Sequence, residues 1–152
     1  MVKVLKQCIK GMVAKKMYCQ KVAIAMAFLL YATLPAYAGE YDDLKAKMSA
    51  ARESLVSMML NKEKRGPDQQ KLVKDTADAV SAQLSMMKAP AGKTAQFKEL
   101  NETWSAFKKT REMELVPAIL KGNDDEAKKI GGGIQKVRIT KCQQLVSELG
   151  GI

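Results

Sequence analysis

The sequence predicts an all-α protein, with four helices in an antiparallel up-down bundle that follows a cleaved signal peptide. Apolar residues recur at spacings of three and four along four segments, which is the pattern of a helix with one buried face. Glycine and proline separate those segments, and a basic and then apolar stretch precedes the first of them. Because the breaks are short, consecutive helices should run in opposite directions and bury their apolar faces together.

Residues 1–38 have the layout of a secretory signal peptide. Six lysines and no acid precede the apolar run VAIAMAFLLYATL, and Ala36 and Ala38 then form the small-x-small pattern of a cleavage site. We therefore predict cleavage after Ala38, export to the periplasm or the exterior, and a four-helix domain of residues 39–152. An uncleaved anchor is the alternative, but the apolar run is short against the roughly 20 residues that a spanning helix needs.

The first two helices are predicted over residues 41–64 and 68–88. Ala, Met, Leu, Lys and Glu dominate the first of them, and no glycine or proline interrupts it. Gly66 and Pro67 end it, because proline cannot continue the hydrogen-bond ladder. The residues expected to face the core share the helical spacing: Tyr41, Leu44, Met48, Ala51, Leu55 and Met58 in the first helix, and Val73, Ala77, Val80, Leu84 and Met87 in the second.

The third helix is predicted to start near Thr94, and Pro117 should kink it by removing one hydrogen bond. The fourth should begin after Asn123, a suitable N-cap that three acidic residues follow in the positive first turn. The expected core residues are Phe97, Leu100, Trp104, Phe107, Leu115 and Ile119 in the third helix, and Ala127, Ile130, Ile134, Val137, Leu145 and Leu149 in the fourth.

Three consecutive glycines, Gly131 to Gly133, interrupt the pattern of the fourth helix. Each glycine costs about 1 kcal/mol in a helix interior, so the run needs an explanation. We favour a local break in the helix over the alternative, which is a hinge or a site of close packing.

Composition argues against several classes of function. Of the 26 basic residues, six lie in the leader, so 20 face 16 acidic residues in the predicted domain, a net charge of +4 that does not indicate nucleic acid. The chain has no histidine, and Cys142 is the one cysteine after the leader, which excludes an internal disulfide and the usual zinc site. Without a nucleophile–base pair, we expect no enzymatic activity, no metal and no cofactor.

The second half of the chain resembles the four-helix-bundle sensory module of methyl-accepting chemotaxis receptors. An aromatic pair, Trp104 and Phe107, precedes the turn Gly122-Asn123, and Glu126 and Ala127 then open the last helix. The first half matches in periodicity only. The resemblance implies an exported sensory module that binds a small ligand or a partner's helices and pairs as a homodimer. The receptors' second transmembrane helix, HAMP segment and cytoplasmic helices have no counterpart in the sequence, so transmembrane signalling by this chain alone is not implied.

Arginines hold the ligand between helices in the aspartate-sensing members of that family, which implies Arg52, Arg111 and Arg138 as candidate ligand-binding residues. Arg111 follows Phe107 at helical spacing and should face inward or lie on the rim of the stripe. An arginine fork there could hold a carboxylate. We favour the competing interpretation, in which the side chain extends past the core to solvent.

A weaker resemblance links the chain to cytochrome b562, another exported four-helix bundle. Met48, in DDLKAKM, stands where that family has a haem-ligating methionine, and Cys142 stands in place of the ligating histidine. The resemblance implies an alternative function as a haem-binding electron carrier that uses Met48 and Cys142, since a thiolate can ligate haem iron. From the residues alone, Cys142 is first a small core residue, second a partner in an intermolecular disulfide, and third a haem ligand.

Overall fold

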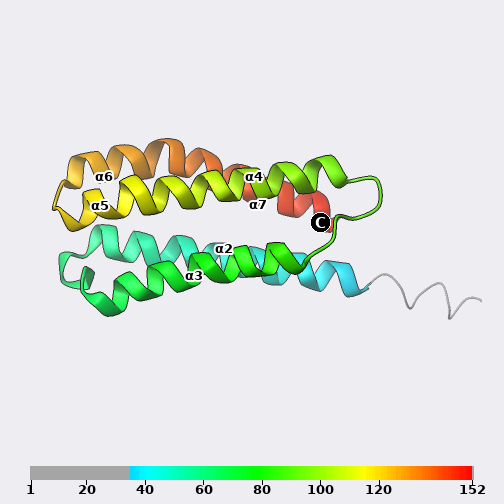
Figure 1. Cartoon of the computed structure of the whole chain (residues 1–152), viewed down its shortest axis with the longest axis horizontal. Coiled ribbons are helices and arrows are strands. Elements are labelled where there is room, and N and C mark those ends of the chain that lie inside the picture. Colours follow the sequence, from blue (N-terminus) through cyan, green and yellow to red (C-terminus); the bar gives the residue numbers. More distant parts are fainter. Residues whose placement is uncertain (1–34, 152) are drawn as a thin grey trace, which may run out of the picture. The chain divides into compact units, whose positions relative to one another are not determined.

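The computed structural model describes residues 35–151, with side chains from Gly39 onward (Figure 1). All regular structure in that part of the chain is helical and falls into four long segments, so the predicted all-α class is confirmed. The chain divides after Ala36 into two units, and the second unit, Tyr37–Ile152, contains these segments except the first two residues of the first helix. No helix among the described residues has the length and apolarity to cross a membrane.

The predicted signal peptide lies outside the described residues as far as residue 34. The first described helix, α2, spans Pro35–Leu60, so its backbone runs across the predicted cleavage site after Ala38. A short 3-10 helix, η1 (Lys62–Lys64), follows it. The second segment, α3, spans Pro67–Met86 and begins with proline in its first turn, where the missing N–H costs nothing. All the core residues predicted for these two segments are buried.

The third segment consists of α4 (Thr94–Thr110), a π-helical turn η2 (Arg111–Leu115) and α5 (Val116–Leu120). The π turn lies directly before Pro117, which has no N–H to donate to the preceding turn. The backbone N–H of Val116 instead donates to the carbonyl of Arg111, five residues earlier. The helix therefore continues past the proline by widening over one turn.

The fourth segment consists of α6 (Asp124–Ile130), a second π-helical turn η3 (Gly131–Gln135) and α7 (Lys136–Gly150). The Asn123 side chain accepts a hydrogen bond from the N–H of Glu126, so the predicted N-cap is confirmed. The glycine run contains the predicted local break, because Gly133 has non-helical torsions of φ −91° and ψ −111°. The helix resumes after one turn.

The π turn η3 changes which residues of the fourth segment face the core. Ile134 and Val137 were expected to be buried, but their side chains are 44% and 64% exposed. Gln135 and Ile139 are buried instead. A π turn holds one more residue than an α turn, so every residue after it rotates by about one position around the helix axis. The prediction for these two residues is therefore wrong, because it assumed unbroken α-helical spacing.

Side-chain hydrogen bonds join each segment to the next one along the chain. Lys47 and Ser54 of α2 bind Gln83 and Thr76 of α3, so residue numbers rise in one helix as they fall in the other. The same reversal relates α3 to α4, through the Ser81–Trp104 and Asp78–Lys108 contacts. It also relates α4 to the last segment, through the Phe107–Gln135 and Glu99–Lys141 contacts.

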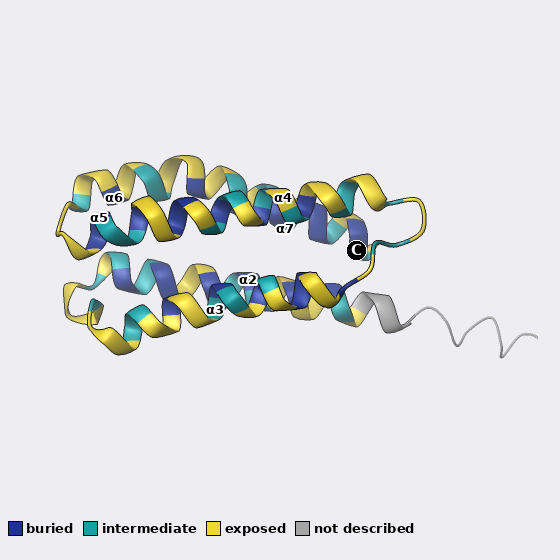
Figure 2. Cartoon of the chain, in the orientation of Figure 1, coloured by how far each residue is buried: buried dark blue, intermediate teal, exposed yellow. Residues whose placement is uncertain are grey.

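Buried side chains line the inner faces of all four segments (Figure 2). They form two separate clusters. The larger cluster contains Tyr41, Leu44, Met48, Trp104, Phe107, Cys142 and Leu145 among others, and the smaller contains Leu55, Met58, Val73, Leu115, Ala118, Ile119 and Ala127.

Candidate ligand-binding site

Arg111 opens the π turn η2, and its side chain lies in the interior of the fold. It is fully buried, so the favoured prediction that it extends to solvent is wrong, and the inward-facing alternative is correct. Its Nη1 donates to the carbonyl of Ala51 at 2.8 Å, and its Nη2 donates to the carbonyl of Val73 and to Ser54 Oγ at 3.5 Å. The guanidinium thus joins α2, α3 and the third segment.

No carboxylate pairs with this guanidinium among the described residues, and its Nε has no hydrogen-bond partner there. Burial lowers the pKa of Arg111 from its usual value to about 10, and the charges of Glu112 and Asp78 only partly oppose that shift. A buried charge held only by neutral oxygens is costly, because the oxygens replace little of its hydration.

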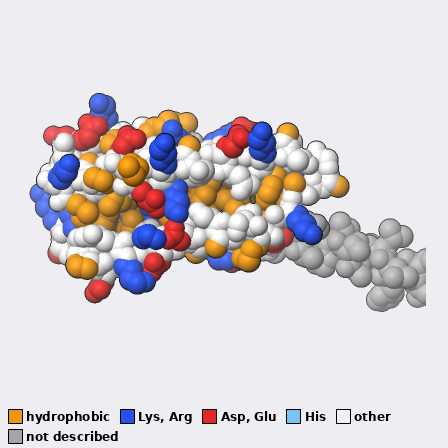
Figure 3. All heavy atoms as spheres, in the orientation of Figure 1, with side chains coloured by type: hydrophobic (Ala, Val, Ile, Leu, Met, Phe, Trp, Pro, Cys, Tyr) orange, Lys and Arg blue, Asp and Glu red, His pale blue; other side chains and the backbone are white. Residues whose placement is uncertain are grey.

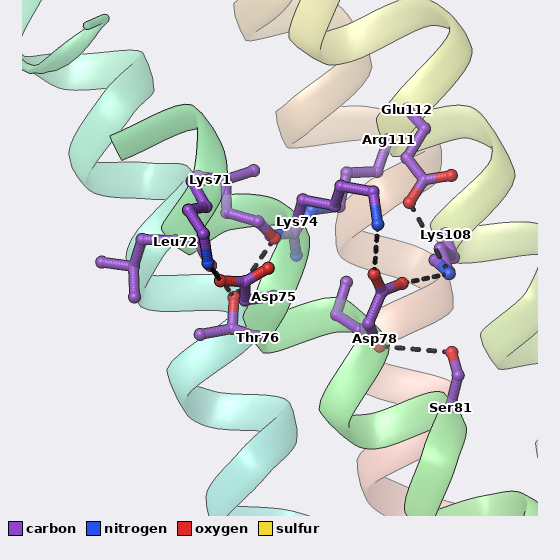
Figure 4. Close-up of polar contacts among 12 residues, drawn as sticks. Lys71, Leu72, Lys74, Asp75, Thr76, Asp78, Ser81, Lys108, Arg111 and Glu112 are labelled. Atoms are coloured by element: carbon purple, nitrogen blue, oxygen red, sulfur yellow. Dashed lines mark hydrogen bonds and ion pairs between the residues drawn. The ribbon is translucent and has the colours of Figure 1, made fainter. Parts of the chain in front are cut away.

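A surface hollow of about 510 Å³ lies beside Arg111, between α3 and the third segment. Lys71, Lys74 and Glu112 contribute charges to its lining, and each of them lies in an ion pair. Figure 4 shows Asp78 between Lys74 and Lys108, and these two ammonium groups, Lys108 first, lower the pKa of the Asp78 carboxyl. On the face drawn in Figure 3, basic and acidic side chains lie near one another around patches of hydrophobic side chains. This hollow offers a ligand no unpaired charge on its surface.

Arg138 and Gln135 bind the backbone of the third segment. Arg138 Nη1 donates to the carbonyl of Ala106 at 3.0 Å and to Thr110 Oγ1 at 2.5 Å. Gln135 Nε2 donates to the carbonyl of Phe107 at 2.9 Å. Gln135 is 3% exposed, and its Oε1 has no hydrogen-bond partner among the described residues. That buried acceptor could receive a hydrogen bond from a ligand.

A second pocket, of about 320 Å³, lies where α2 faces both π turns, and we call it the α2–η3 pocket. Two of its lining residues are exposed cations, Arg52 and Lys136, and no acidic residue lines it. Gln135 contributes its buried amide. The remaining lining is apolar side chain or glycine backbone: Leu55, Val56, Met59, Phe107, Leu115, Gly131, Gly132 and Ile139.

The glycine run brings the backbone of η3 close to α2 at this pocket. A Cβ at Gly131 would lie 3.2 Å from Met59 Sδ, whereas a Cβ at Gly132 or Gly133 would meet nothing within 4 Å. The close-packing interpretation of the run therefore holds at Gly131, and the break lies at Gly133. π turns occur frequently at functional sites, and this pocket contacts both of the π turns in the described chain.

The three predicted arginines do not converge on one site. Arg52 lines the α2–η3 pocket, Arg111 borders the hollow beside α3, and Arg138 binds the backbone of α4. Sequence reasoning missed Gln135 and Lys136, because unbroken α-helical spacing places Ile134 on the inner face instead. The glycine run was the signal that could have shown a change of register there.

Met48 and Cys142, the candidate haem ligands, lie in the same core cluster, and neither side chain is exposed. Cys142 is a free cysteine, as the favoured interpretation of a small core residue requires. Burial raises the pKa of its thiol from 9.0 to about 12, so the group is a neutral thiol at pH 7, whereas iron is ligated by the thiolate. The described residues contain no group of three acids or cysteines that could hold a metal ion.

The Cys142 thiol should react only when the fold opens. At pH 8 we expect iodoacetamide to modify it at least about a hundredfold more slowly than it modifies the same chain in denaturant, because both burial and the raised pKa suppress the thiolate. Mass spectrometry of timed samples gives both rates. Because the pKa of this thiol is higher in the folded state than in the unfolded state, its titration lowers the free energy of unfolding as the pH rises above 9. Equal rates in the two conditions would contradict the burial of Cys142.

Comparison of the chain with protein-family models, with curated proteins and with solved structures finds no match in any of the three. Function is therefore argued from the site itself.

Proposed function

We propose that the chain is an exported four-helix module that binds a small molecule between its helices, as the sensory modules of chemotaxis receptors do. The opposed residue numbering across each pair of neighbouring segments supports an antiparallel up-down bundle. The basic, apolar leader and the Ala38 junction support export to the periplasm or the exterior. Signal transmission across a membrane would fall to another chain.

The α2–η3 pocket is the observation that carries this proposal. Its volume of about 320 Å³ falls at the small end of the roughly 300–1,000 Å³ range of ligand sites. It also has their usual composition, an apolar lining with a few polar groups. Arg52 is the predicted arginine that fits this role, because it reaches the pocket and makes no ion pair with a described residue.

The haem-carrier alternative has less support. Met48 and Cys142 lie in a packed cluster with neighbours such as Leu44 and Leu145, and a haem would have to displace several of them. The neutral thiol of Cys142 would also have to lose its proton in an apolar environment.

A panel of small neutral and charged organic fragments, screened by saturation-transfer NMR, tests the binding function. The decisive variant is Gly131→Leu, because a side chain at this position points toward Met59 and fills one end of the pocket. We expect at least one fragment to bind the parent saturably and to lose about tenfold or more in affinity with Gly131→Leu.

Gly66→Leu is the matched control, because it makes the same change outside the pocket, at a position where a Cβ meets nothing within 4 Å. Circular dichroism melting tests whether both variants are folded. If no fragment binds in a way that depends on Gly131, the proposal is overturned.

A further inference from the structure

The α2–η3 pocket has its apolar residues in the interior and its charged residues at the surface. Leu55, Phe107, Leu115 and Ile139 are buried and form its interior. The exposed side chains among its lining residues are those of Arg52 and Lys136, and both are cations. A ligand would therefore meet an apolar interior and a positively charged mouth.

No acidic residue in the described part of the chain neutralises the two cations at the mouth. Arg52 and Lys136 make no ion pair with a described residue, whereas Lys74, Lys108 and Lys141 are all paired with acids. They also come from different segments, α2 and α7, so the fold brings two positive charges to one opening. Like charges held close together repel, and an anion between them removes that repulsion.

We infer that the α2–η3 pocket binds an amphipathic monocarboxylate, a medium-chain fatty acid in its ionised form, an inference that rests on the proposed binding function. The alkyl chain lies among the apolar side chains, where burial of each methylene is favourable. The carboxylate lies at the mouth between Arg52 and Lys136, with the arginine able to bind both of its oxygens. The pocket volume of about 320 Å³, at the small end of the range of ligand sites, suits a medium-length chain.

Met59 allows the pocket to adjust to the chain. Its flexible thioether lies between α2 and Gly131, where it can change rotamer without moving the backbone. Replacing Gly131 would remove that freedom, because a Cβ there already lies 3.2 Å from Met59 Sδ.

Isothermal titration calorimetry with octanoate, octanol and octylammonium tests the ligand class on protein expressed from the full-length chain. At pH 7 and low salt we expect octanoate to bind about tenfold or more tightly than octanol, and octylammonium to bind more weakly than either. Salt at about 1 M should reduce the advantage of octanoate over octanol, because the charges at the mouth are exposed to solvent.

The cation variants locate the carboxylate. Arg52→Ala and Lys136→Ala should each lower the affinity for octanoate by about three- to tenfold and leave the affinity for octanol unchanged. The matched controls Lys45→Ala and Lys128→Ala remove exposed, unpaired lysines of α2 and α6 that do not line the pocket, and should not change octanoate binding.

The outcomes separate this inference from the function on which it rests. Equal affinity for octanoate and octanol, or octanoate binding that ignores both cations, overturns the carboxylate class but leaves a binding pocket. If octanoate does not bind at all while fragments still bind in a Gly131-dependent way, the ligand class is wrong and the binding function stands.

Discussion

Replacing Arg111 with methionine is expected to leave the protein folded and to raise its free energy of unfolding by about 1–3 kcal/mol. The guanidinium is fully buried and has no carboxylate partner among the described residues, and burial lowers its pKa to about 10. That lowering corresponds to roughly 3 kcal/mol against the charged form, of which its hydrogen bonds return a part. The carbonyls of Ala51 and Val73 lie inside α2 and α3, so they keep helical partners after the substitution.

Arg111→Ala is the matched comparison, because it removes the charge and the volume together. We expect it to destabilise the protein by about 2–4 kcal/mol through the cavity that it leaves. Urea denaturation followed by circular dichroism measures both variants. A loss of more than about 2 kcal/mol in Arg111→Met would mean that the hydrogen bonds to α2 and α3 outweigh the cost of burying the charge.

The same buried cation should affect how stability depends on pH. Because its folded pKa is below its unfolded pKa, the unfolded state retains the proton more strongly, and stability rises as the pH increases above about 10. Over that range the free energy of unfolding of the parent should therefore rise relative to that of Arg111→Met. Lysine and tyrosine titrations affect both proteins equally, so they do not contribute to this difference.

Deleting Gly132 is expected to weaken ligand binding while maintaining or raising the free energy of unfolding. The π turn η3 carries one residue more than an α turn, and removing one restores α-helical spacing between Ala127 and the buried Gln135 and Ile139. Loss of a glycine from a helix interior should contribute about 1 kcal/mol. The regular helix would close the widened turn that lines the α2–η3 pocket. We therefore expect the affinity for octanoate, and for any fragment that the pocket binds, to fall about tenfold or more.

Gly132→Ala separates the length of the turn from its glycine content. It removes the same glycine but keeps the residue count, and a Cβ at this position meets nothing within 4 Å. We expect Gly132→Ala to raise the free energy of unfolding by about 0.4–1 kcal/mol and to retain binding. If the deletion variant binds as the parent does, then η3 does not shape the pocket. If the deletion unfolds the protein, the expected gain in stability is wrong and the extra residue of η3 is required for the fold.

Where the helices are regular, the structure agrees closely with the prediction from the sequence. In α2 and α3 the hydrophobic spacing is unbroken, so each predicted core residue is buried, from Tyr41 to Met58 and from Val73 to Leu84. The start of the second segment at Pro67 and the cap at Asn123 also match, because each depends on the chemistry of one local residue. The first helix was predicted to run to residue 64, but α2 ends at Leu60 and a 3-10 turn follows it.

The candidate site could not be derived in the same way. Arg52 was identified from the sequence, but its neighbours in the pocket, Lys136 and Gln135, come from a segment whose register depends on η3. A run of glycines indicates that a helix is disturbed there, and it does not show whether the disturbance adds a residue to the turn or ends the helix.

The sequence by itself determined the helical class, the four segments and most of the core, because periodic burial and helix ends are properties of a few neighbouring residues. Only the tertiary structure decided the position of Arg111, whose partners lie 38 to 60 residues away in α2 and α3. It also decided which cations share the mouth of the α2–η3 pocket. Both depend on the rotation of one helix against another, and two π turns set that rotation.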